Sequence, residues 1–283
     1  MSLGWKYCIL IAALLAAPGW ALATMVRIDT VKGPIDIHLY DEATPLTVAN
    51  FLSYVHSGAY NNSFFHRLAS GFVLQGGGYT FPPLTPVVKG AAVQNEFSAT
   101  RSNLRGTVAM AKLGGNANSA TSEWFVNLGN NSANLDKQNG GFTVFGKVTL
   151  PSLGVVDGIA ALQIINAGGA FDTLPVVSLP VSGPLVRENL AMVNTARELP
   201  TTAASDTDRV LNYLEAAYPQ YVQPASPATL TAGGYLYRYY AKSNAYVGTK
   251  DGNVYYLVPA ISNDVTLMGT LADWLTTATA NGY

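Results

Sequence analysis

The sequence has little of what several large classes of protein require. It contains one cysteine, Cys8, so no disulfide can form within the chain. Of its 3 histidines, His38 and His56 have no neighbours at the spacing of metal ligands, which argues against a zinc site. We therefore expect no disulfide scaffold, no metal and no other cofactor.

Charge is also scarce. Lys and Arg together number 16, Asp and Glu number 17, and the formal net charge is -1. Proteins that bind nucleic acid carry basic clusters, and this sequence has none. We therefore expect no nucleic-acid partner.

The only long apolar run lies at the N-terminus. Lys6 precedes an apolar stretch at residues 8–17, and small residues at 21–23 follow it. This order is typical of a cleavable secretory signal peptide, and the run is too short to span a bilayer. We expect cleavage near Ala23, loss of Cys8 with the peptide, and a periplasmic mature protein without a membrane anchor. A eukaryotic secretory route fits the same pattern.

What the sequence does contain, from residue 25 on, is many short apolar runs separated by Gly, Asn and Ser. Residues 25–40 alternate apolar and polar side chains around a turn at Lys32 and Gly33, which predicts a hairpin. A helix is predicted from Pro45 to Gly58. Many short strands with turns between them indicate an all-β barrel or sandwich. The other predicted elements are strands at 64–68, 72–75, 107–111, 124–128 and 142–148, a helix at 153–165 and a closing strand at 190–196.

The last third of the chain has a different pattern. Residues 200–205 are small and polar, as in a linker. A helix is predicted next, with Leu211, Leu214 and Tyr218 on one face, and Pro219 would end it. Strands at 235–240, 245–249 and 254–258 and a short helix at 271–276 would complete a small α+β C-terminal module.

Five tyrosines stand out in that module. They could form a platform for a ligand, but simple strand alternation in a small sheet explains them without one. The module could also dock the protein to a partner or surface while adding nothing to its chemistry. The five are Tyr235, Tyr237, Tyr239, Tyr255 and Tyr256.

Four motifs follow one another in the middle of the chain. They are FHRLASGFVLQGGG at 65–78, RGTVAMA at 105–111, SEWF at 122–125 and FTVFGKV at 142–148. Together they resemble the signature of the cyclophilins, a family of peptidyl-prolyl cis/trans isomerases. The resemblance runs from about residue 25 to about residue 199. It implies a mainly β fold, a closed antiparallel eight-stranded barrel capped by two helices.

The expected organisation has four parts. Residues 1–23 form the signal peptide, residues 24–199 the cyclophilin-like isomerase domain and residues 200–205 a linker. Residues 206–283 form the α+β module, which looks like a compact module seen on other exported bacterial proteins and has no function that we can assign.

The resemblance implies isomerisation of X-Pro bonds in exported proteins, which assists their folding. Twisting an amide costs about 18–20 kcal/mol because it breaks the resonance. No proton, metal or nucleophile is strictly required to lower that barrier, since a dry groove and one well-placed donor favour the twisted state. The expected partners are proline-containing polypeptides, and we expect a monomer.

Arg67 is the expected catalytic residue. Its guanidinium is always charged and offers several donors to the prolyl nitrogen and the neighbouring carbonyl, and the matching arginine has this role in cyclophilins. Outside the motif, a surface ion-pair arginine would be the simpler interpretation. His66 is expected to pack within the barrel, because the reaction needs no base.

The resemblance also implies a substrate-binding surface. Apolar side chains would line a proline pocket, Gln75 would hold Arg67 in place, and backbone near Ala111 and Lys112 would pair with an extended substrate. Taken singly, each apolar residue would more simply be barrel core, and Gln75 a satisfied strand glutamine. The expected pocket residues are Phe72, Val73, Phe125, Leu135 and Phe142.

Glu123 departs from the family pattern, which usually has glutamine there. A carboxylate at this position could pair with Arg67 and draw its donors away from the substrate. That leaves an alternative function, a proline-peptide-binding module or holdase chaperone with weak or no turnover. Asn134 and Phe142 also depart from the pattern, and neither obviously abolishes turnover.

Overall fold

The computed structural model describes residues 24–179, 183–223 and 227–283. The predicted signal peptide lies outside the described residues. Among the helices in the described ranges, none has the length and apolar composition needed to cross a bilayer.

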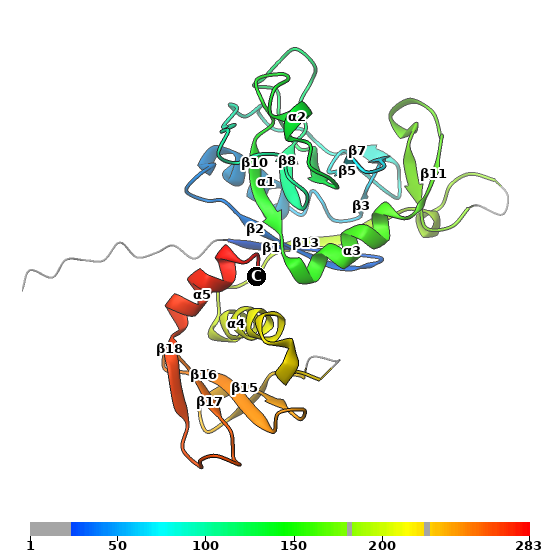
Figure 1. The fold of residues 1–283 in the computed structure, drawn as a ribbon. Coiled ribbons are helices and arrows are strands. Elements are labelled where there is room, and N and C mark those ends of the chain that lie inside the picture. Colours follow the sequence, from blue (N-terminus) through cyan, green and yellow to red (C-terminus); the bar gives the residue numbers. More distant parts are fainter. Residues whose placement is uncertain (1–23, 180–182, 224–226) are drawn as a thin grey trace, which may run out of the picture.

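One large sheet organises the first part of the chain (Figure 1). Its strand order is β4-β5-β9-β8-β10-β2-β1-β13-β3-β6-β7, and each neighbouring pair runs antiparallel. The strands are β1 Met25–Thr30, β2 Gly33–Leu39, β3 Ser63–Phe64, β4 Arg67–Ala69, β5 Val73–Gly76, β6 Tyr79–Thr80, β7 Thr85–Pro86, β8 Thr107–Met110, β9 Trp124–Asn127, β10 Val144–Val148 and β13 Met192–Glu198.

The sheet curls because one stretch of chain contributes an end strand, β4, and also a strand near the other end, β3. β3 pairs with β13, while β4, which follows after Phe65 and His66, pairs with β5. The Phe65 amide donates to the Ala191 carbonyl oxygen at 3.0 Å, and the His66 amide donates to the Gln75 carbonyl oxygen at 3.1 Å. The prediction of a mainly β fold is confirmed, with 11 strands that are more and shorter than the eight expected.

Two helices pack on the core that the curled sheet encloses. The buried aromatic ring of Phe51, from α1 (Pro45–His56), lies 5.0 Å from the ring of Phe145 and 6.0 Å from that of Trp124. Val156 and Ile159, from α3 (Leu150–Ala160), join the same cluster. Both helices therefore gain their stability chiefly from burying an apolar face.

The predicted boundaries of α3 were wrong. The helix begins at Leu150 with a proline in its first turn, where a missing amide hydrogen costs nothing. Residues 163–165 form strand β11 (Gln163–Ile165) instead of helix, because they pair with β12 (Leu174–Val176). The remaining elements of this region are α2 Ser132–Leu135 and the 3₁₀ turns Gly169–Phe171 and Arg187–Asn189.

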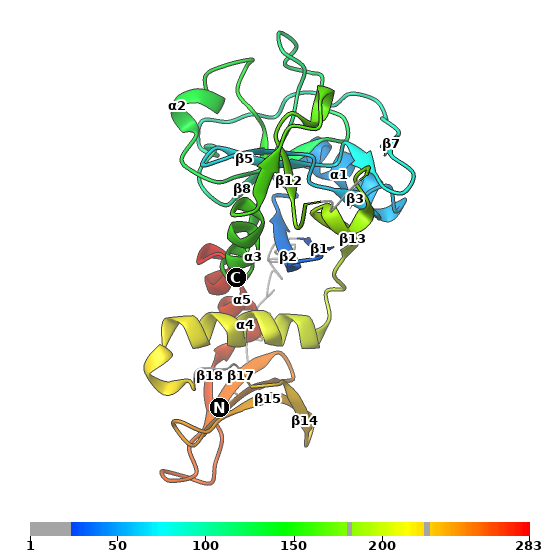
Figure 2. The same ribbon diagram turned by 90° about the vertical axis from the view of Figure 1, so that its right-hand side faces the viewer.

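The last part of the chain forms a second, antiparallel sheet in the order β14-β15-β16-β17-β18. In both views α4 lies between this sheet and the first one (Figures 1 and 2). The three predicted strands and two predicted helices are present, and β14 and β18 were missed. The elements are α4 Ala203–Ala217, a 3₁₀ turn Pro219–Tyr221, β14 Leu230–Ala232, β15 Tyr235–Tyr240, β16 Ala245–Lys250, β17 Asn253–Leu257, β18 Thr266–Thr270 and α5 Leu271–Ala280.

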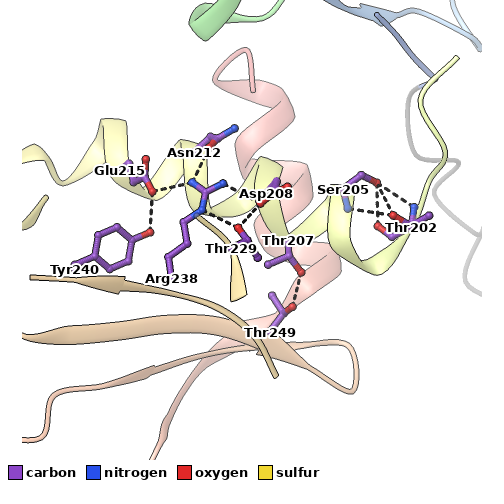
Figure 3. Close-up of polar contacts among 10 residues, drawn as sticks. All are labelled: Thr202, Ser205, Thr207, Asp208, Asn212, Glu215, Thr229, Arg238, Tyr240 and Thr249. Atoms are coloured by element: carbon purple, nitrogen blue, oxygen red, sulfur yellow. Dashed lines mark hydrogen bonds and ion pairs between the residues drawn. The ribbon is translucent and has the colours of Figure 1, made fainter. Parts of the chain in front are cut away.

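Arg238 ties α4 to this sheet (Figure 3). Its side chain is 8% exposed, and it donates to Asp208 and Glu215 at 2.8 Å each. Asn212 accepts a third bond at 2.8 Å, and the Tyr240 hydroxyl donates to Glu215 at 2.9 Å. A buried cation with this many acceptors fixes the helix over one face of the sheet.

The expected linker at 200–205 is shorter than predicted. The Thr202 hydroxyl accepts from the Ser205 amide at 3.2 Å, so Thr202 caps α4 and the helix begins at Ala203. The two parts also touch directly, because the Leu150 amide donates to the Gly282 carbonyl oxygen at 3.0 Å.

Candidate active site

Strand register brings three predicted site residues into one row. Arg67 on β4 pairs with Gln75 on β5, and Gln75 pairs with Phe125 on β9. Residues directly opposite each other in an antiparallel sheet project to the same face. The row therefore places the cation, the amide and one aromatic ring side by side.

The Arg67 guanidinium has a single polar neighbour among the described residues. Its Nη1 donates to Gln75 Oε1 at 3.4 Å, a long bond. No carboxylate in the described part of the chain lies within ion-pair distance of Arg67. The ion-pair interpretation of Arg67 thus finds no partner, and most of its donors remain available.

The apolar residues that the motifs predicted gather in one cluster beside that row. Val73, Phe125 and Leu135 are buried in it, and the ring of Phe142 lies 5.9 Å from that of Phe125 at 66°. Phe72, Ala111 and Phe142 are only partly buried, so the cluster keeps an exposed apolar edge. A separate hollow of about 550 Å³, lined among others by Arg101, Arg105 and Lys147, does not include Arg67.

Glu123 does not pair with Arg67, which corrects the expectation from sequence. One carboxylate oxygen accepts from Gln75 Nε2 at 2.8 Å and lies 3.4 Å from His66 Nε2, and the other lies 3.6 Å from Lys89 Nζ. Because the amide nitrogen of Gln75 donates to Glu123, the amide carbonyl oxygen of Gln75 faces Arg67. The carboxylate therefore orients the amide that contacts the guanidinium.

His66 is 3% exposed and lies edge-on to the ring of Tyr79 at 5.3 Å. It packs within the sheet, as predicted, and it also borders Glu123. The contribution of Lys89 was missed. This residue lies in a loop outside the four motifs, so no sequence pattern links it to the site.

Lys112 lies at the far side of the apolar cluster. Its Nζ donates to the carbonyl oxygens of Gly141 at 2.6 Å and Asn139 at 2.9 Å, and it lies 4.7 Å from the centre of the Phe142 ring. Burial lowers the pKa of this amine to about 8. β8 ends at Met110, so residues 111–112 follow the strand and do not belong to it.

In the described ranges of the chain, no group of three His, Cys, Asp or Glu side chains could hold a metal ion. The site therefore offers a cation, an amide and an apolar surface. This combination suits stabilisation of a twisted amide by hydrogen bonding more than proton transfer or nucleophilic attack.

The Glu123 carboxyl should make stability depend on pH. Its pKa is lowered from 4.5 to about 2, first by the hydrogen bond with His66 and further by Gln75 and Lys89, against the opposing effect of burial. A folded-state pKa below the unfolded one stabilises the fold fully above pH 4.5 and loses this effect as the pH falls toward 2. We expect Glu123→Gln to lower the free energy of unfolding by about 2–3 kcal/mol near neutral pH.

Urea unfolding of both proteins at a series of pH values measures this difference. It should shrink between pH 4.5 and 2. His38, whose pKa burial lowers to about 4, titrates in the same range, but its effect cancels because both proteins carry it. A difference that stays constant with pH would contradict this account of Glu123.

Comparison with known proteins is consistent with the geometry. The family profile described as cyclophilin type peptidyl-prolyl cis-trans isomerase/CLD matches residues 25–179. A peptidyl-prolyl cis-trans isomerase of Acinetobacter baylyi is 38% identical over 193 residues, which cover 68% of this chain and 98% of that protein. Peptidyl-prolyl cis-trans isomerase A of Dickeya dadantii is 39% identical over 52% of this chain and 76% of its own length.

A solved cyclophilin-type isomerase of Cryptosporidium parvum, studied with the dipeptide Ala-Pro, aligns with a TM-score of 0.48 at 20% identity, covering 62% of this chain and 99% of its own. The family match and the bacterial relatives establish the family of this chain. The chain belongs to the cyclophilin-type peptidyl-prolyl cis-trans isomerases.

Proposed function

We propose that Arg67 is the catalytic residue of this isomerase and that the apolar cluster holds the prolyl ring of the substrate. The observation that carries the proposal is that the Arg67 guanidinium, placed by strand register in the row of Gln75 and Phe125, has no carboxylate partner among the described residues. The other substrate-binding residues in the proposal are Phe72, Val73, Gln75, Ala111, Lys112, Glu123, Leu135 and Phe142.

The proposed chemistry uses the change in the amide during rotation. When the X-Pro bond twists, resonance is lost and the prolyl nitrogen becomes pyramidal with a free lone pair. A guanidinium N–H directed at that lone pair binds the twisted state better than the planar one, and an apolar surface strengthens the bond by excluding water. A ten-thousandfold acceleration needs only about 5.5 kcal/mol of such differential binding.

Gln75 and Glu123 act through Arg67 in this scheme. Gln75 accepts from the guanidinium and limits its rotation, and Glu123 fixes which end of the Gln75 amide faces Arg67. A fixed donor loses less conformational entropy when the substrate arrives. The proposed substrates are proline-containing segments of polypeptides.

Replacement of Arg67 by alanine is the main test. We expect Arg67→Ala to lower kcat/KM for a proline tetrapeptide by about a hundredfold or more, because one transition-state donor is lost. Arg67→Lys should recover only part of this loss, since an ammonium lacks the planar fork of donors. A protease-coupled or NMR exchange assay measures both variants.

Arg197→Ala is the control, because Arg197 is an arginine of the same sheet that is 49% exposed and lies 3.6 Å from Asp29 on the neighbouring strand. Its rate should equal that of the wild type. Full activity in Arg67→Ala would refute the proposed role.

The same assay on residues 24–199 tests whether the isomerase unit, as proposed, works without the C-terminal module.

The effect of Glu123→Gln on turnover separates two possible roles of the carboxylate. It either orients Gln75 or weakens the donors of Arg67. A glutamine can still accept from Gln75, but more weakly than a carboxylate, so we expect kcat/KM to fall by about threefold. We expect kcat/KM to fall further in Glu123→Ala, because Gln75 then has no fixed orientation. A rate that rises in Glu123→Gln would instead support the holdase alternative, in which the carboxylate weakens Arg67.

We also propose that residues 1–23 direct the protein to a bacterial periplasm, where it assists folding of exported proteins as a monomer without a membrane anchor. The order of cation, apolar run and small residues supports this, as do the bacterial relatives. Cell fractionation and N-terminal sequencing should find a mature chain that begins near Thr24. A full-length chain in the cytoplasm would contradict the proposal.

Two features of architecture remain proposals of the same kind. The curled sheet would close into a barrel, because residues 63–69 contribute the end strand β4 and also β3, which lies near the other end. The elements after residue 202 would form a separate module, because the family match ends at residue 179 and the second sheet has its own apolar core.

A further inference from the structure

The second sheet carries most of its tyrosines on one face. Tyr235, Tyr237 and Tyr239 alternate along β15 with Arg238 and Tyr240, which point to α4. Residues of β16 and β17 lie in register with these tyrosines. Tyr239 pairs with Tyr246 on β16. Tyr237 pairs with Gly248 on β16, and Gly248 in turn pairs with Tyr255 on β17. Alternation places Tyr256 on the opposite face. We call the first set, Tyr235, Tyr237, Tyr239, Tyr246 and Tyr255, the tyrosine face.

The helices leave the tyrosine face uncovered. The core between α4, α5 and the sheet contains Val247 and Val254, which alternate with the residues of the tyrosine face. Both views place the helices on that one side of the sheet (Figures 1 and 2). No helix in the described ranges packs on the other side, where Tyr239 is exposed and the other four tyrosines are partly buried. The tyrosine face is therefore a partly exposed aromatic surface, of the kind that marks interaction sites.

The tyrosine rings pack against one another. Tyr239 and Tyr246 have ring centres 4.8 Å apart, and Tyr235 and Tyr255 have ring centres 5.7 Å apart. The rings therefore form two mutually supported groups, Tyr235 with Tyr255, and Tyr246 with Tyr237 and Tyr239. Rings held in this way lose little conformational freedom when a ligand binds.

A small hollow lies at the centre of the face, at Gly248. A Cβ at this position would come within 2.5 Å of the Leu236 carbonyl oxygen and of Tyr237 Cβ, so only glycine fits. The hollow measures about 140 Å³. Enclosed small-molecule sites are usually about 300–1,000 Å³, so this one suits a single ring or side chain of a longer polymer.

The chemistry of the face narrows the choice of polymer. None of the residues that line the hollow is an acid, a base or an amide. The nearby Lys250 is occupied, since its Nζ donates to the Gly233 carbonyl oxygen at 3.1 Å and lies 4.8 Å from the centre of the Tyr235 ring. Polyanions need free cations, so nucleic acid does not fit.

The available polar groups are hydroxyls. Among the described residues, the hydroxyls of Tyr235, Tyr237, Tyr246 and Tyr255 have no hydrogen-bond partner. A polyproline II segment is the complementary ligand: it has free carbonyl acceptors, few amide donors and flat apolar rings, and aromatic-lined surfaces recognise it.

We propose that the tyrosine face binds polyproline II segments of polypeptides, as a second site distinct from Arg67. Binding itself is independent of the proposed catalytic mechanism. Its benefit rests on that mechanism, because a polypeptide held at the face presents its other X-Pro bonds to the catalytic surface at a raised effective concentration.

NMR titration of the full chain with decaproline tests the proposal. We expect shift changes at residues 235–239, 246–248 and 255, and about a tenfold or greater loss of affinity at these signals in Tyr237→Ser and Tyr246→Ser. Tyr256→Ser is the matched control, because Tyr256 is 39% exposed on the opposite face of the same sheet, and it should bind as the wild type does. Tyr237→Phe, which keeps the ring, should retain part of the affinity and shows that the serine effect is not a loss of fold.

Several outcomes would overturn the proposal. These are no shift changes at the tyrosine face with decaproline, equal affinity in the serine variants, or binding of a chitin oligosaccharide in place of decaproline. A dimer that dissociates in Tyr246→Ser, seen by analytical ultracentrifugation, would assign the face to a second copy of the chain. Arg67→Ala keeps these measurements separate from catalysis, since it should lose isomerase activity and keep binding at the tyrosine face.

Discussion

The hydrogen-bond chain from Glu123 through Gln75 to Arg67 is the constraint on which the site depends. A carboxylate that is about three-quarters buried would be costly alone, but His66, Gln75 and Lys89 surround it and lower its pKa to about 2. The carboxyl group is therefore ionised at neutral pH. A permanent acceptor on one side of Gln75 leaves only its carbonyl oxygen for Arg67, and the other donors of the guanidinium bind no acceptor among the described residues.

Strand register explains which of the predicted site residues could be grouped from the sequence and where that reasoning stopped. The motifs fix which residues lie on neighbouring strands, so Arg67, Gln75 and Phe125 could be grouped without coordinates. The partner of Glu123 could not. Gln75 and Arg67 are both near enough in the sheet to attract a carboxylate, and the choice depends on side-chain direction and on Lys89, which approaches from a loop.

Secondary structure was predictable where one face of an element is buried and less so elsewhere. The hairpin of β1 and β2 and the helix α1 follow from clear apolar periods. Ile164 and Ile165 extend the apolar run of α3, but residues 163–165 form strand because pairing with β12 outweighs continuation of the helix. β14 has only three residues and all of them are exposed, so its sequence is too short to mark a strand, and it was missed for that reason.

The second sheet shows the limit of alternation as evidence. Strand periodicity accounts for tyrosines at every second position of β15, and it would do so whether the uncovered face served a ligand or only water. More can be learned from the residues that all strands together place on each face of the sheet. Arg238 and its acceptors anchor the helices on one face, so the rings on the other have no role in closing the core. Their hydroxyls reduce the cost of exposing this aromatic surface to water.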